Sequence, residues 1–264
     1  MLIPHRAPLQ EGRFLARYDR FIATVELGGQ VIEAHCVNPG RMEGLVVTGA
    51  RAWVSQVPPE SKRKLRYTLE ILEIDGRYVG ANTVIPNALA ETLIRARLVP
   101  GLKRYRTLRR EVRYGDNSRI DLLLTQGDRE HYVEVKNCHL VYPDGGAYFP
   151  DSVSVRAAGH LRELATVIEG GARATVLFVI QRDDARLVRP SALHDPHFAQ
   201  AAIDAAAAGV CFRAVALDPR PDGFHFLGTL PVNTGRYDPE PLRTFKTALD
   251  ATSGWQRRGG RRSA

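Results

Sequence analysis

Three charged residues in the middle of the chain have the types and spacing of a metal-dependent hydrolytic site. Asp121 lies in the apolar run 118–125, and Glu134 and Lys136 follow within the apolar run 131–136. Side chains alternate along a β-strand, so Glu134 and Lys136 share one face. Two charged groups on one face of an otherwise apolar strand predict a functional site.

A short hairpin through residues 127–128 can pair these two strands and place Asp121 beside Glu134. Adjacent carboxylates repel each other unless a cation lies between them, and hard oxygen ligands suit Mg²⁺ (or Mn²⁺). Lys136 would then flank the metal, where its charge can position a water molecule or stabilise charge on a phosphate. A surface ion pair between Glu134 and Lys136 on an edge strand is the alternative interpretation. The apolar neighbours favour the metal site, because unpaired charge in such surroundings costs about several kcal/mol.

Two further acidic residues are candidates for an additional metal ligand. Glu91 lies in a helix expected over residues 87–98, where it can equally face solvent. Glu111 begins a strand among several arginines, where a structural salt bridge is the alternative.

Basic residues at several places are candidates for contacts with the phosphates of DNA. Each has an alternative interpretation as an ordinary solvated loop, strand or helix surface. These candidates are Lys62, Arg63, Lys64, Arg109, Arg110, Arg156 and His160.

The elements that must position these residues fall into two groups. The first third has strand patterns and tight turns but no helix of length, which favours a five-stranded OB-like β-barrel. These strands are expected over residues 21–27, 30–36, 51–57, 66–74 and 77–83.

From residue 84 onward, helices alternate with apolar strands, which is typical of an α/β domain with a mixed sheet flanked by helices. Helices are expected over residues 87–98, 155–169 and 195–208, and strands over 111–114, 118–125, 131–136, 174–180 and 210–217. We therefore divide the chain into a barrel (1–83), a mixed-sheet domain (84–235) and a basic, flexible tail (236–264).

The composition points to a soluble protein with a polyanionic partner. The 264 residues carry a net charge of +8, which favours nucleic acid, and no apolar run is long enough to span a membrane. Cys36, Cys138 and Cys211 have no C-x-x-C spacing, so we expect neither a disulfide framework nor a zinc site, and the cytoplasm as the location. No P-loop, dinucleotide-binding or metalloprotease motif is present.

The Asp…Glu-x-Lys arrangement resembles the PD-(D/E)XK nuclease superfamily, in which the acids bind metal and the lysine assists hydrolysis. The wider chain is similar to the sugar fermentation stimulation protein family. The segments that carry this similarity are RYDRF (17–21), CVNPGRM (36–42), SKRK (61–64), SRID (118–121), EVKN (134–137), YFPD (148–151) and HLREL (160–164). The second segment departs from the usual C-P-N-T-G-x-M pattern, which puts the shape of its turn in doubt.

This resemblance implies a bacterial or archaeal cytoplasmic DNA-binding protein with an OB-like barrel and a PD-(D/E)XK nuclease-like domain. We expect largely non-specific DNA binding and a Mg²⁺-dependent phosphodiesterase site. A non-catalytic DNA-binding regulator of sugar utilisation genes is the alternative function. A small-molecule sensor that uses the barrel is a third.

Overall fold

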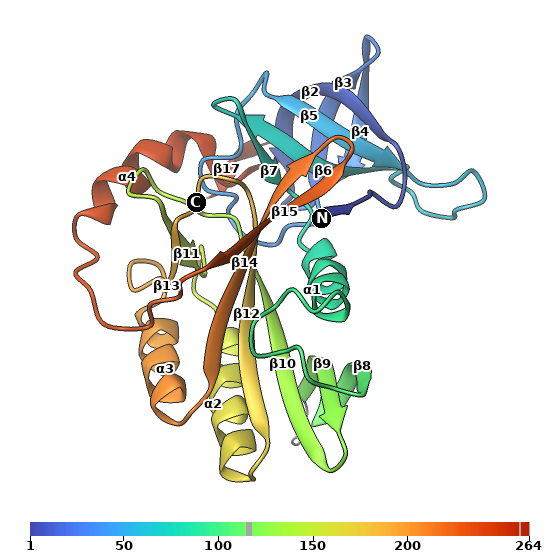
Figure 1. The fold of residues 1–264 in the computed structure, drawn as a ribbon. Helices are drawn as coiled ribbons and strands as arrows, with labels where there is room; N and C mark the ends of the chain where they lie inside the picture. Colours follow the sequence, from blue (N-terminus) through green and yellow to red (C-terminus); the bar gives the residue numbers. More distant parts are fainter. Residues whose placement is uncertain (115–117, 259, 264) are drawn as a thin grey trace.

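The computed structural model describes residues 1–114, 118–258 and 260–263. The chain forms two large β-sheets, one for each half of the sequence, and helices cover the second (Figure 1). No helix in these described residues is long and apolar enough to cross a membrane.

The N-terminal sheet contains a ring of five strands in the order β2-β3-β4-β6-β5, closed by pairing of β5 with β2, and three further strands lie outside the ring. Its core includes Phe14, Val25 and Leu69, none of which is exposed. The strands are β2 (Leu9–Tyr18), β3 (Ile22–Leu27), β4 (Gln30–His35), β5 (Arg51–Gln56), β6 (Tyr67–Ile74) and β7 (Arg77–Gly80). The expectation of an N-terminal OB domain is confirmed.

The membership of the ring differs from the five strands expected from the sequence. β7 pairs only with β6 and lies outside the ring, whereas the unexpected β2 belongs to it. β2 contains Gly12 and changes register between Phe14 and Ala16, so its residues do not alternate regularly between polar and apolar. The turn between β3 and β4 forms as expected: Gly28 and Gly29 have φ of 57° and 79°, the left-handed region that a tight hairpin requires.

The C-terminal sheet has seven strands in the order β1-β15-β14-β12-β10-β9-β8. Its centre is parallel and its outer strands are antiparallel, so the expectation of a mixed sheet is confirmed. The strands are β1 (Leu2–Ile3), β8 (Thr107–Tyr114), β9 (Ser118–Gln126), β10 (Arg129–Cys138), β12 (Arg173–Gln181), β14 (Cys211–Arg220) and β15 (Gly223–Leu230). A separate two-stranded parallel sheet contains β11 (Gly146–Phe149) and β13 (Leu187–Pro190).

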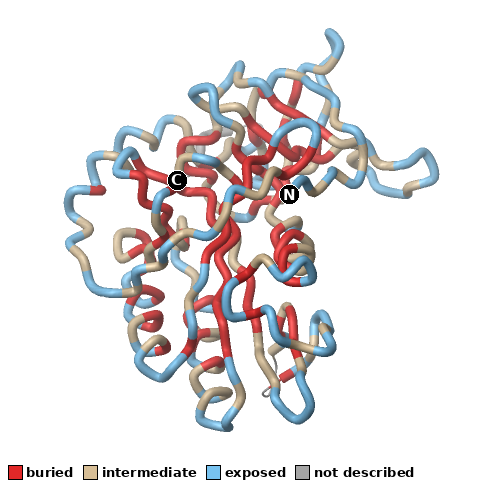
Figure 2. Tube along the Cα trace, in the orientation of Figure 1, coloured by how far each residue is buried: buried red, intermediate tan, exposed pale blue. Residues whose placement is uncertain are grey.

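Helices cover both faces of this sheet. α1 (Ile85–Arg95) lies on one face, and α2 (Val155–Glu169) and α3 (Pro196–Ala207) lie on the other (Figure 1). Within β12, Leu177 packs in the α1 layer and Phe178 in the α2–α3 layer. The central strands are therefore buried on both sides, as the burial colours in Figure 2 show, and this explains their continuous apolar sequence.

Each end of the chain adds strands to the sheet of the other domain. β1, from the N-terminus, pairs with β15 of the C-terminal sheet. α4 (Leu242–Leu249), a short 3₁₀ turn (Asp250–Thr252), β16 (Trp255–Arg257) and β17 (Gly260–Ser263) follow the C-terminal sheet, and β16 pairs with β2.

The segment 236–264, which the sequence predicts to be a basic, flexible tail, thus contains a helix and two short strands, and its residues 259 and 264 lie outside the described residues. The apolar residues of the tail are few, but their helical spacing brings Leu242 into a cluster with Tyr142 and Tyr148. Arg17 and Arg20 both lie over the ring of Trp255. Packing of a few well-placed side chains therefore orders a segment of low overall hydrophobicity.

We expect Leu242→Ala to lower the free energy of unfolding by about 2 kcal/mol or more, because it removes a buried side chain from this small cluster. Urea denaturation of the full chain measures the change. Thr244→Ala, at an exposed position of the same helix, is the control and should change stability by less than about 0.5 kcal/mol. Equal effects of the two substitutions would show that α4 is not anchored through Leu242.

Candidate active site

The strands β9 and β10 separate at the position of Asp121. Their antiparallel pairing runs as far as Leu122 opposite Val133. The next residues are Asp121 and Glu134, and the Asp121 Oδ2 atom accepts a hydrogen bond from the backbone N–H of Val135 at 2.7 Å. The carboxylate thus occupies the place of a backbone acceptor, and both acidic side chains lie where the two strands part.

Asp121 has a second partner from the α1 face. The Asn87 Nδ2 atom, near the start of α1, donates to Asp121 Oδ1 at 2.7 Å. Burial, together with the negative charge of Glu134, raises the pKa of Asp121 to about 6, although the two hydrogen bonds and Lys136 act in the opposite direction. Asn87 was not expected from the sequence, where nothing sets it apart from other polar residues at the start of a helix.

Glu134 is the most enclosed charged group of the site, with 3% of its surface exposed. Its Oε1 atom accepts hydrogen bonds from Lys136 Nζ at 2.7 Å and from His160 Nδ1 at 2.5 Å. Its Oε2 atom is buried without a hydrogen-bond partner in the described structure. Burial raises the pKa of Glu134, but the hydrogen bond from His160 and the charge of Lys136 outweigh it, so the pKa is lowered and the group is an anion.

The helix α2 supplies the residues that fix the position of the Glu134 carboxylate from one face of the sheet. Ser154 caps this helix by accepting a hydrogen bond from Ala157 N, which sets where its first turn lies. Arg156 Nε donates to His160 Nε2 at 3.3 Å, so the imidazole donates to Glu134 through Nδ1. The structure therefore places His160 beside Glu134 and Arg156 beside His160, and both basic residues were expected to contact DNA.

The donor set fits a divalent cation. Two neighbouring carboxylates supply hard oxygen atoms, and the unpartnered Glu134 Oε2 is a buried acceptor of the kind that a cation satisfies. Among the described residues no group of three or more His, Cys, Asp or Glu side chains converges as a complete ligand set. Water and phosphate oxygens would have to complete the coordination of such an ion.

The two additional acids have different environments. Glu91 forms ion pairs with Arg95 at 2.8 Å and with Arg110 at 3.3 Å, so its carboxylate is already neutralised. Glu111 is exposed and has φ of 52°, and it interrupts the pairing of β8 with β9 directly opposite Asp121. The register of β8 and β9 is the same on both sides of Glu111, so the strand is distorted at this residue without an inserted residue.

The remaining basic candidates lie apart from the carboxylates. Arg109 is an exposed residue of β8. Lys62, Arg63 and Lys64 are exposed on the loop between β5 and β6, in the other domain, where Arg63 Nη2 also donates to Thr68 Oγ1 at 3.1 Å.

The fold and this site define a class of protein in which an OB domain precedes a mixed α/β domain that carries two adjacent carboxylates. Family models match both halves: "SfsA N-terminal OB domain" over residues 15–81 and "Sugar fermentation stimulation protein RE domain" over residues 84–223. The chain belongs to the sugar fermentation stimulation protein family, as the motifs in the sequence indicated.

Relatives support this assignment over most of the chain. A sugar fermentation stimulation protein homolog of Maricaulis maris is 46% identical over 81% of this chain and 91% of its own length. The corresponding homolog of Geotalea uraniireducens is 44% identical over 85% of this chain and 97% of its own length. The solved structure of Pyrococcus furiosus SfsA in complex with Ca²⁺ has a TM-score of 0.79 and 29% identity, and covers 88% of this chain and 98% of the solved chain.

We expect the Asp121 carboxyl of the metal-free protein to titrate near pH 6, well above its ordinary value of 3.8. A carboxyl whose pKa rises on folding stabilises the protein fully below about pH 3.8, and this contribution is lost as the pH rises through about 6. An NMR titration of the carboxyl carbons measures the pKa directly.

Glu134→Gln removes the neighbouring charge and should lower the pKa of Asp121 toward its ordinary value. Glu169→Gln, at the far end of α2, is the matched control and should leave the pKa of Asp121 unchanged. A pKa of about 4 or lower in the metal-free protein would contradict the described coupling of the two carboxylates.

Proposed function

We propose that this protein binds DNA and hydrolyses its phosphodiester bonds at a divalent-metal site formed by Asp121, Glu134 and Lys136. The observation that carries the proposal is the buried, unpartnered Oε2 atom of Glu134, beside a second carboxylate and a lysine. Structural ion pairs rarely leave a buried carboxylate oxygen unsatisfied. The Pyrococcus furiosus relative was solved in complex with Ca²⁺, which supports a divalent-metal site here, with Mg²⁺ or Mn²⁺ as the ion for catalysis.

Each residue of the site has a distinct task in this proposal. Asp121 and Glu134 hold the ion, which would activate water and stabilise negative charge on the phosphate. Hydrogen bonds from Asn87 and the Val135 N–H fix the orientation of Asp121.

Lys136 and His160 form hydrogen bonds with the Oε1 atom of Glu134, and these bonds keep the carboxylate ionised and oriented. The Lys136 ammonium, 2.7 Å from Glu134 Oε1, places a positive charge at the edge of the site, where it stabilises charge that develops on a phosphate. Arg156, which the sequence also predicts to contact DNA, is exposed next to His160.

DNA is the substrate that the charge distribution favours. The chain has a net charge of +8 in a protein of 264 residues. Exposed basic residues occur in both domains, including Lys62 and Lys64 on the OB domain and Arg109 and Arg156 on the second domain. Scattered surface charges contact phosphates without reading bases, so we propose largely sequence-independent binding by a protein of the cytoplasm.

We expect Lys136→Ala to reduce Mg²⁺-dependent DNA cleavage by about 100-fold or more, because the substitution removes a charge that stabilises the transition state. Cleavage of single-stranded, duplex and branched DNA measures the effect. Gel-shift affinity in the absence of metal should change little, since Lys136 is largely enclosed and bound to Glu134. Lys246→Ala, on α4, is the matched control and should leave cleavage unchanged.

Two results would separate the proposed nuclease from its alternative. DNA binding without cleavage of any of these substrates in Mg²⁺ or Mn²⁺ would favour the non-catalytic DNA-binding regulator of sugar utilisation genes. Cleavage that persists in Lys136→Ala and in Glu134→Gln would place the activity elsewhere.

We expect DNA affinity to fall by about 10³ or more between about 50 and about 200 mM salt, because binding releases counterions from the contacted phosphates. Replacing Lys62 and Lys64 with Gln should reduce the salt slope by about 0.9 for each phosphate that these two side chains neutralise. A nearly flat salt dependence, or a preference of about 1000-fold for one duplex sequence, would contradict non-specific electrostatic binding.

A further inference from the structure

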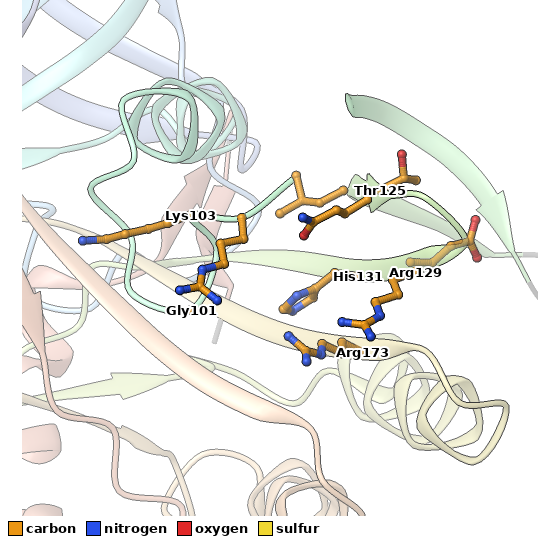
Figure 3. Close-up of a pocket in the computed structure, with 10 residues that line it drawn as sticks. Gly101, Lys103, Thr125, Arg129, His131 and Arg173 are labelled. Atoms are coloured by element: carbon orange, nitrogen blue, oxygen red, sulfur yellow. The ribbon is translucent and has the colours of Figure 1, made fainter. Parts of the chain in front are cut away.

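A basic pocket of about 450 Å³ lies at the end of the sheet near the hairpin between β9 and β10. Figure 3 shows Arg129, His131 and Arg173 side by side, with the loop that carries Gly101 and Lys103 opposite them. This loop follows α1 and also contributes Arg104. The pocket thus combines the ends of neighbouring strands with one connecting loop.

This pocket lies on the opposite face of the sheet from Glu134. His131 and Glu134 are separated by an odd number of positions in β10, so their side chains point to opposite faces. His131 is opposite Leu124 of β9 and Arg173 of β12, on the face that α1 covers farther along the sheet. The pocket is therefore a site separate from the carboxylate pair.

Four cations line the pocket, and none of them is paired with a carboxylate. Lys103, Arg104, Arg129 and Arg173 form no ion pair within the part of the chain that the structure describes. Glu130 is the one acidic residue of the lining, and its Oε2 atom accepts a hydrogen bond from the Tyr132 hydroxyl at 2.8 Å. Like charges gathered in a hollow repel one another unless an anion joins them.

His131 adds a polar group without adding charge at neutral pH. Burial and the neighbouring Arg173 lower the pKa of His131 to about 4. Its Nε2 atom lies 2.8 Å from the hydroxyl oxygen of Thr175, which fixes the orientation of the ring. The pocket floor is therefore ordered, while the flanking arginines are exposed and able to contact a ligand.

We propose that this pocket binds the phosphate groups of a ligand that carries two or more phosphates in a row. The volume lies within the range of small-molecule sites, and four cations exceed the charge of a single phosphate. Arginine guanidinium groups bind phosphate oxygens in a bidentate manner, and three of the four cations are arginines. The phosphates belong either to a free polyphosphate compound or to a DNA backbone.

Inorganic tripolyphosphate is the probe, with the full chain and isothermal titration calorimetry at low salt. We expect the double variant Arg129→Gln/Arg173→Gln to bind tripolyphosphate at least tenfold more weakly than the wild type. The control, Arg236→Gln/Arg243→Gln, removes the same net charge from exposed positions near the C-terminal end of the chain and should change the affinity less than twofold. Circular dichroism of both variants checks that the fold is retained.

A competition experiment with DNA identifies the source of the phosphates. Displacement of tripolyphosphate by a short DNA duplex assigns the pocket to the DNA path, and simultaneous binding assigns it to a free polyphosphate. The absence of tripolyphosphate binding, or an equal loss of affinity in both double variants, would overturn the proposal. Glu134→Gln should bind tripolyphosphate normally, so failure of the proposed nuclease site and failure of this pocket give different results.

Discussion

The arrangement of the C-terminal domain depends on one buried carboxylate, that of Glu134. A carboxylate with 3% of its surface exposed and no partner would lower the free energy of unfolding, so the fold must bring compensating groups to Glu134. Lys136 reaches it from the same strand, and His160 reaches it from α2. Only one of the two carboxylate oxygens is satisfied in this way. The protein thus stabilises the anion and keeps one oxygen available, which is the condition for binding a cation without losing the fold.

A second buried carboxylate connects the two domains. Glu43 lies between β4 and β5 of the OB sheet, and it accepts a hydrogen bond from the Tyr142 hydroxyl at 2.5 Å and lies 2.9 Å from His194 Nε2. Nearby, Arg17 is 1% exposed and donates to backbone carbonyls, including that of Gly254 near the C-terminus. Breaking a buried pair of this kind typically costs about 3–5 kcal/mol. The OB domain is therefore held firmly beside the domain that carries the candidate site.

The sheet separates two regions of different charge in the second domain. On one face, the Glu134 carboxylate lies beside His160 of α2. On the other face, beyond the end of α1, Arg129 and Arg173 line a basic pocket. Alternation of side chains along β10 creates this division from a single strand.

Local sequence patterns determined much of this protein. Apolar strands, glycine turns and capped helices predicted the OB domain and the mixed sheet, and the spacing of Asp121, Glu134 and Lys136 predicted their neighbourhood in the β9–β10 hairpin. These patterns depend on residues close in the chain. Only the tertiary structure decided the contacts between residues that lie far apart in the sequence. These contacts are Asn87 with Asp121, His160 with Glu134, and Trp255 with Arg17. No periodicity encodes such contacts, because they arise only when separate elements pack together.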